Sequence, residues 1–126
     1  MAKILVVDDE PDLVEMIKAA LESASYQVVT AYNGQEGIDK ARQEKPNAIV
    51  LDIMMPEKDG FATCKELKAD PICQEIPILI LTAVGEHFSN TRYAKSMGLE
   101  LEAEDYIDKP VDPKVLLARI AGLLKK

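Results

Sequence analysis

The chain has 126 residues, of which 48% are hydrophobic and 29% charged, so it can bury the core of a single domain without disulfides or a structural metal. Its 15 Lys and Arg residues against 22 Asp and Glu residues give a formal net charge of −7, which argues against nucleic acid and membrane as direct partners. No apolar run approaches the roughly 20 residues of a membrane-spanning helix, and the N-terminus lacks the features of a signal peptide. We therefore expect one cytoplasmic domain over residues 1–126, with Cys64 and Cys73 as free thiols.

Short apolar runs rich in β-branched residues alternate with amphipathic stretches of about a dozen residues, which predicts a series of βα units. Four of the expected strands are apolar on both faces, as in a parallel sheet buried between two helix layers. The expected strands are residues 4–7, 28–31, 48–51, 78–81 and a weaker one around 106–107.

Helix signals fill the segments between these strands. Pro11 opens the first helix, with Asp9 or Glu10 as its expected cap, and Asp112-Pro113 opens the last. The expected helices are residues 11–24, 35–44, a third from after Gly60 to before Asp70, a fourth within 88–97 and a fifth from 113 to 124. The sequence therefore predicts an α/β fold of (βα)₅ type, a doubly wound three-layer sandwich around a five-stranded parallel sheet.

Charged and polar residues follow four of the expected strands. In such a sheet, ligands bind outside the carboxyl ends of the strands, where this sequence places Asp8 and Asp9, Asp52, Thr82 and Lys109. The three aspartates would crowd like charges into a small volume, which is costly unless a cation binds. Mg²⁺ suits such a site because it prefers oxygen ligands and keeps several waters. We therefore expect a magnesium site.

A cation beside a carboxylate and an ammonium is what in-line phosphoryl transfer requires. On this interpretation Asp52 is the nucleophile, while Mg²⁺, Lys109 and Thr82 each bind one phosphoryl oxygen. Each residue alone has a simpler explanation, as a helix cap, a strand end or a solvated loop residue. Their occurrence together at one sheet edge favours a functional site.

Four motifs, in this order, carry a family resemblance. They are ILVVDDE at residues 4–10, LDIMMPEKDG at 51–60, LTA at 81–83 and YIDKP at 106–110. With these motifs the chain resembles a response-regulator receiver domain of two-component signalling from residue 3 to residue 124. The resemblance implies the flavodoxin-like strand order 2-1-3-4-5, a phosphoacceptor at Asp52 and a signalling domain that catalyses only its own phosphorylation and dephosphorylation.

The resemblance also assigns the metal ligands. Asp8 and Asp9 correspond to the acidic pair that binds Mg²⁺, with Asp9 as the direct ligand. Asp52 and the backbone carbonyl of Met54 complete the protein ligands.

Further family roles fall on the last two strand ends. Lys109 and Thr82 correspond to the groups that bind the phosphoryl oxygens, and Lys109-Pro110 corresponds to a cis peptide. Tyr106 corresponds to an aromatic residue that moves inward when the threonine hydroxyl is recruited. Residue chemistry alone favours the alternative that Tyr106 is a static, half-buried aromatic, and the family context favours the moving one.

The partners implied by the resemblance are a sensor histidine kinase or histidine phosphotransfer protein as donor and an effector protein or output domain as receiver of the signal. Phosphorylation would switch the face of the fourth helix, fifth strand and fifth helix, and a homodimer formed on phosphorylation is a further option. Because the chain ends just after the last helix, we expect no output domain in it. It is then a single-domain regulator or a fragment of a larger protein.

Two features depart from the family pattern. Met54 and Val84 occupy the positions that tune dephosphorylation, and neither can hydrogen-bond an attacking water, which predicts slow self-dephosphorylation. Residues 99–105 form a connection longer than is usual in the family, either an acidic surface turn, an extension of the fourth helix or a partner contact. This insertion leaves the family's dimer geometry open.

Two other functions compete with the receiver interpretation. A Mg²⁺-dependent phosphohydrolase would use the same aspartyl nucleophile, but it needs a second acid and a cap over the substrate. A flavodoxin-like cofactor binder would offer backbone amides to a phosphate in the first βα loop, where this chain has Asp8-Asp9-Glu10-Pro11. His87 is expected to be a solvated loop residue and not a site of phosphorylation.

Overall fold

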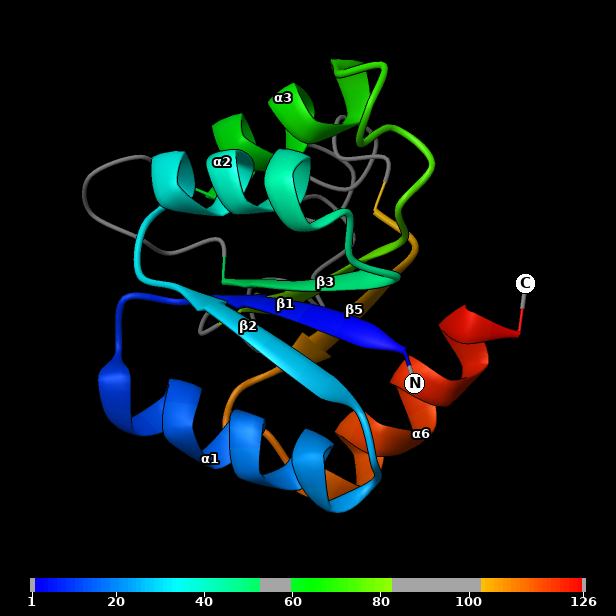
Figure 1. The fold of residues 1–126 in the computed structure, drawn as a ribbon. Coiled ribbons are helices and arrows are strands. Elements are labelled where there is room, and N and C mark those ends of the chain that lie inside the picture. The colour runs from blue at the N-terminus through cyan, green and yellow to red at the C-terminus, as the bar shows by residue number, and fades with distance from the viewer. Residues whose placement is uncertain (1, 53–59, 83–102, 126) are drawn as a thin grey trace, which may run out of the picture.

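The computed structural model describes residues 2–52, 60–82 and 103–125 (Figure 1). All five expected strands are present, each within one or two residues of its expected ends, and the fourth expected helix lies outside the described residues. In chain order the elements are β1 (Lys3–Val7), α1 (Pro11–Ser23), β2 (Gln27–Ala31), α2 (Gly34–Glu44), β3 (Ala48–Asp52), α3 (Gly60–Ala69), β4 (Ile78–Thr82), β5 (Asp105–Asp108) and α6 (Pro113–Leu124).

The five strands form one parallel sheet in the order β2-β1-β3-β4-β5. Figure 1 shows α1 and α6 covering one face of this sheet and α2 and α3 covering the other. Both the three-layer architecture and the strand order implied by the family resemblance are therefore confirmed. The reversal of strand order falls at β1 and β3, whose carboxyl ends are followed by or end in aspartates.

The core is divided into two clusters because successive strand side chains point to opposite faces of the sheet. Leu5 and Val7 of β1 pack toward α2 and α3, whereas Ile4 and Val6 pack toward α1 and α6. The central strands β1 and β3 are buried on both faces, as expected. β2 is an edge strand, and of its five residues only Ala31 is fully buried.

The start of α1 differs from expectation. Glu10 occupies the N-cap position but its side chain makes no capping hydrogen bond, so the expected cap by Asp9 or Glu10 is wrong. Asp8 Oδ1 instead accepts a hydrogen bond of 3.0 Å from the Glu10 backbone N–H. Pro11 opens the helix as expected.

Glu104 and Asp105, the last two residues of the expected insertion, contact neighbouring helices and strands. Glu104 Oε2 lies 2.8 Å from Lys68 Nζ of α3, and Glu104 Oε1 accepts a hydrogen bond of 2.7 Å from the Ile78 backbone N–H. Asp105 begins β5 and pairs with Arg119 of α6 at 2.6 Å. Residues 104 and 105 therefore connect α3, β4, β5 and α6, while residues 99–102 lie outside the described part of the chain.

Two predictions made from composition can be compared with the described residues. Within these ranges no helix is long and apolar enough to cross a membrane. Cys64 and Cys73 are buried thiols that form no disulfide among the described residues, and both belong to the core cluster packed under α2 and α3.

Candidate functional site

Two buried aspartates lie side by side at the carboxyl edge of the sheet. Asp8 directly follows β1 and Asp52 ends β3, and the two strands pair with Val7 opposite Leu51. Asp8 is 0% exposed and Asp52 is 1% exposed. Asp9 is partly buried beside them. The topology therefore brings together the three aspartates that the sequence singled out.

With Glu10, these aspartates form a cluster that we call the acid cluster. One carboxylate oxygen from each of Asp8, Asp9, Glu10 and Asp52 lies within 4.8 Å of the others. Oxygen ligands at this density are what a small divalent cation takes. The cluster is open at Glu10, whose side chain is 61% exposed, and closed at Asp8 and Asp52.

Lys109 supplies the positive charge nearest to the acid cluster among the described residues. Its Nζ lies 3.1 Å from Asp52 Oδ2, 3.0 Å from Glu10 Oε1 and 3.6 Å from Asp8 Oδ2. Lys109 follows β5, and the Lys109-Pro110 peptide is cis, as the family resemblance implied. The fold thus brings the Lys109 ammonium to the Asp52 carboxylate past one intervening strand, β4.

Burial and the neighbouring charges shift the pKa values of Asp8 and Lys109. Burial, followed by the neighbouring Asp52 charge, raises the pKa of Asp8 to about 7. Burial alone would lower the pKa of Lys109, but its hydrogen bond to Glu10 and the charges of Asp52 and Asp8 outweigh burial and raise it. Lys109 therefore stays charged at neutral pH, while Asp8 resists ionisation next to Asp52.

Asp8 Oδ2 is the atom that best fits a metal site. It is buried and makes no hydrogen bond to any of the residues described. Lys109 Nζ lies 3.6 Å from this oxygen, beyond hydrogen-bond distance, so a bound metal cation would compensate a buried carboxylate oxygen that no hydrogen bond satisfies. Together with Asp9 and Asp52, this donor set is all oxygen and suits Mg²⁺.

Of the remaining predicted site residues, Tyr106 and the main chain of Thr82 are described. The main chain of Thr82 ends β4, where it pairs in register with Asp108, and its side chain lies outside what is described. Tyr106 pairs with Ile80 and packs against the core cluster on the α2 and α3 side. Burial raises the pKa of the Tyr106 hydroxyl. Met54 and Val84 lie outside the described residues.

Glu10 is the site residue whose role sequence reasoning missed. Its position immediately after Asp8 and Asp9 was visible, but an acid just before a helix is most often a cap. Its partner Lys109 is 99 positions away along the chain. Only the fold brings the two side chains into contact.

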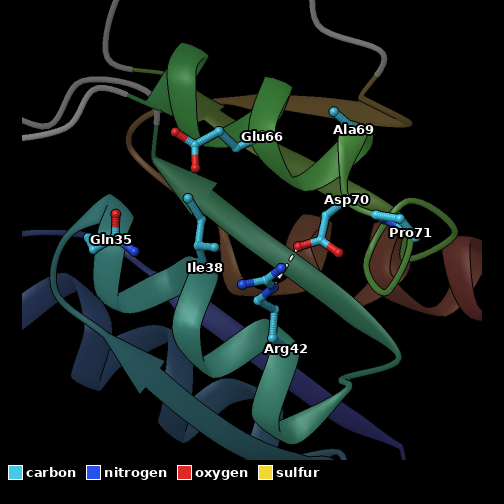
Figure 2. Close-up of a pocket in the computed structure, with 7 residues that line it drawn as sticks. All are labelled: Gln35, Ile38, Arg42, Glu66, Ala69, Asp70 and Pro71. Carbon is cyan, nitrogen blue, oxygen red and sulfur yellow. Dashed lines mark ion pairs between the residues drawn. The ribbon is translucent and has the colours of Figure 1, made fainter.

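A separate cavity of about 390 Å³ lies between α2 and α3 (Figure 2). Arg42 reaches across it from α2 to Asp70, with 2.7 Å between Nε and Oδ2. Ile38 and Glu66 also line it. None of the acid cluster residues lines this cavity, so it is distinct from the site at the sheet edge.

Comparison with known families gives one domain match. Residues 4–121 match the model of the response regulator receiver domain. Among curated proteins, the alkaline phosphatase synthesis transcriptional regulatory protein PhoP of Bacillus subtilis is 44% identical over 124 residues, which is 98% of this chain and 49% of that protein. The chain therefore spans about half the length of this relative.

Solved structures agree with this match. A putative response regulator from Chloroflexus aurantiacus superposes with a TM-score of 0.88 at 34% identity, covering 99% of this chain and 98% of that chain. The receiver domain of a sensor histidine kinase from Pseudomonas aeruginosa gives a TM-score of 0.87 at 26% identity, covering 99% of this chain and 98% of that one. That structure has a magnesium ion coordinated in its active site cleft.

Proposed function

Because the chain belongs to the response regulator receiver domain family of two-component signalling, we propose that Asp52 accepts a phosphoryl group. The donor is a phosphohistidine on a sensor histidine kinase or on a histidine phosphotransfer protein. The domain itself catalyses the transfer to Asp52 and the later hydrolysis. The proposal goes beyond family membership in naming the acceptor, the ion and the residues that assist.

Asp52 has the surroundings that a phosphoacceptor needs. Its carboxylate lies at the end of β3 with Lys109 Nζ 3.1 Å away, and the acid cluster adjoins it. A carboxylate oxygen of Asp52 attacks the phosphorus, so an O–P bond forms while the P–N bond of the phosphohistidine breaks. The electron pair of the broken bond stays on the donor's imidazole nitrogen. Lys109 stabilises the charge on the phosphoryl oxygens throughout.

Asp8, Asp9 and Asp52 are the described residues that would hold Mg²⁺, with the backbone carbonyl of Met54 as a further proposed ligand. When bound, the ion supplies positive charge that offsets both the carboxylates and the phosphoryl oxygens. The buried Asp8 Oδ2 supports this assignment because it makes no hydrogen bond to the described residues. The domain thus needs the cation for its own charge balance as well as for transfer.

Thr82 and Tyr106 are the proposed switch residues. On phosphorylation the Thr82 hydroxyl binds a phosphoryl oxygen, and the Tyr106 ring moves further inward. The adjacency of β4 and β5 and the packing of Tyr106 against the core support this coupling. The affected face includes β5 and α6, and it is where an effector protein, an output domain or a second copy of the chain would bind.

The acceptor is tested by treating the protein with acetyl phosphate and Mg²⁺ and measuring its intact mass. Wild type should gain the mass of one phosphoryl group, and Asp52→Asn should gain none. Asp39→Asn is the matched control, since Asp39 is an exposed aspartate of α2 whose carboxylate contacts Gln35. An equal gain by Asp52→Asn would show that another residue is the acceptor.

A further inference from the structure

Glu10 precedes α1 and contacts Lys109 instead of capping the helix. It stands at the N-cap of α1 without capping it, and its carboxylate reaches Lys109 Nζ at 3.0 Å. The Glu10 side chain is 61% exposed, whereas that of Lys109 is 13% exposed. The pair therefore lies at the solvent-facing rim of the acid cluster.

Lys109 is shared among several acceptors. Its ammonium has three N–H donors, and three carboxylates lie around it at 3.0, 3.1 and 3.6 Å. A phosphoryl group on Asp52 would add negatively charged oxygens that need the same ammonium. Glu10 then holds part of the hydrogen-bonding capacity that the phosphoryl group requires, and it adds a like charge beside that group.

We propose that Glu10 is a positioning residue that competes with the phosphoryl group for Lys109. Before phosphorylation, Glu10 holds the Lys109 ammonium at the rim of the acid cluster. After phosphorylation, Glu10 weakens the hydrogen bonds between Lys109 and the phosphoryl oxygens. This inference rests on the proposed function, because it takes Asp52 as the acceptor. The competition from Glu10 lowers the stability of the phosphorylated state, in addition to any effect of residues 54 and 84.

The charge of Glu10 acts with opposite sign on the two ligands of the site. Its carboxylate lies in the acid cluster, so it favours the binding of a cation. The same carboxylate disfavours an anionic group on Asp52. A residue with a merely structural role would change both affinities in the same direction.

The experiment compares Glu10→Gln, Glu10→Ala and Glu10→Asp with wild type. Mg²⁺ alone is titrated first, and beryllofluoride, a mimic of the phosphoryl group, is then titrated at saturating Mg²⁺, both followed by Tyr fluorescence. Glu22→Gln is the matched control, since Glu22 is an exposed carboxylate near the other end of α1. Circular dichroism verifies that each variant is folded.

Glu10→Gln and Glu10→Ala should bind beryllofluoride about two- to fivefold more tightly than wild type and bind Mg²⁺ alone more weakly, because an exposed ion pair has an effect of this size. Glu10→Asp, which keeps the charge, and Glu22→Gln should stay close to wild type. Unchanged or weaker beryllofluoride binding by both neutral variants overturns the inference alone. Failure of wild type to bind beryllofluoride overturns the proposed function as well.

Discussion

Asp8 carries a carboxylate that its surroundings disfavour when no cation is bound. Burial and the nearby Asp52 charge raise its pKa to about 7. Replacing Asp8 by Asn removes the charge but keeps an oxygen that can accept from the Glu10 backbone N–H. We predict that Asp8→Asn stabilises the metal-free domain by about 1 kcal/mol at pH 8, measured by urea unfolding in the presence of a chelator.

The same residue gives the stability a pH dependence of known sign. Folding raises the pKa of Asp8 from 3.8 to about 7, so the folded state binds its proton more tightly than the unfolded state. The contribution of Asp8 to stability is therefore greatest below pH 3.8 and is lost as the pH rises to about 7. The gain from Asp8→Asn should grow across this range. Parallel stability curves for the two proteins would contradict this origin of the shift.

Sequence reasoning found the buried half of the site but not its rim. Asp8, Asp52 and Lys109 could be predicted because each follows or ends an apolar strand, and parallel strands bring their carboxyl ends to one edge. Glu10 could not be assigned in this way, because its contact is set by how α1 and the end of β5 meet in space. Local patterns carry no information on a contact between residues so far apart along the chain.

The glycines Gly37 of α2 and Gly122 of α6 differ in how much space surrounds them. A Cβ on Gly37 would lie 2.9 Å from Cγ2 and 3.0 Å from Cγ1 of Val7, a fully buried residue of β1. A Cβ on Gly122 of α6 would meet nothing within 4 Å. Gly37 thus allows α2 to approach β1, whereas Gly122 has no such role.

We predict opposite effects for alanine at these positions. Gly37→Ala gains about 1 kcal/mol of helix propensity but pays roughly 1–3 kcal/mol for overpacking, so it should destabilise the domain by about 1 kcal/mol. Gly122→Ala should stabilise it by up to about 1 kcal/mol. Thermal and urea unfolding at fixed Mg²⁺ compare the two. A gain in stability for Gly37→Ala would mean that α2 can shift away from Val7 at little cost.

At the level of elements, the sequence predicted existence and type well and local detail less well. Apolar runs predicted β1 to β4 because buried parallel strands are apolar on both faces, whereas β5 gave a weaker signal because only the two central residues of its sequence DYID are apolar. The reduced burial of β2 followed from its place at the sheet edge, which the pattern of that segment does not reveal.

For the whole molecule, alternation of strands and helices predicted the layers, whereas the strand order depended on family resemblance. Periodicity states which face of an element is apolar but not which strands become neighbours. The order matters because it places β1 beside β3 and thereby Asp8 beside Asp52. The concentration of negative charge at one edge, within a chain of net charge −7, is therefore a property of the topology.

This concentration of charge predicts that Mg²⁺ stabilises the entire domain. A ligand that binds only the folded state adds about 2.7 kcal/mol at a concentration of 100 times its Kd, and this gain should appear in urea unfolding of wild type. Asp9→Asn should lose most of it. NaCl at equal ionic strength is the control, because general screening also relieves repulsion between carboxylates. If NaCl stabilised the domain as much as Mg²⁺, the acid cluster would be responding to ionic strength and not binding an ion.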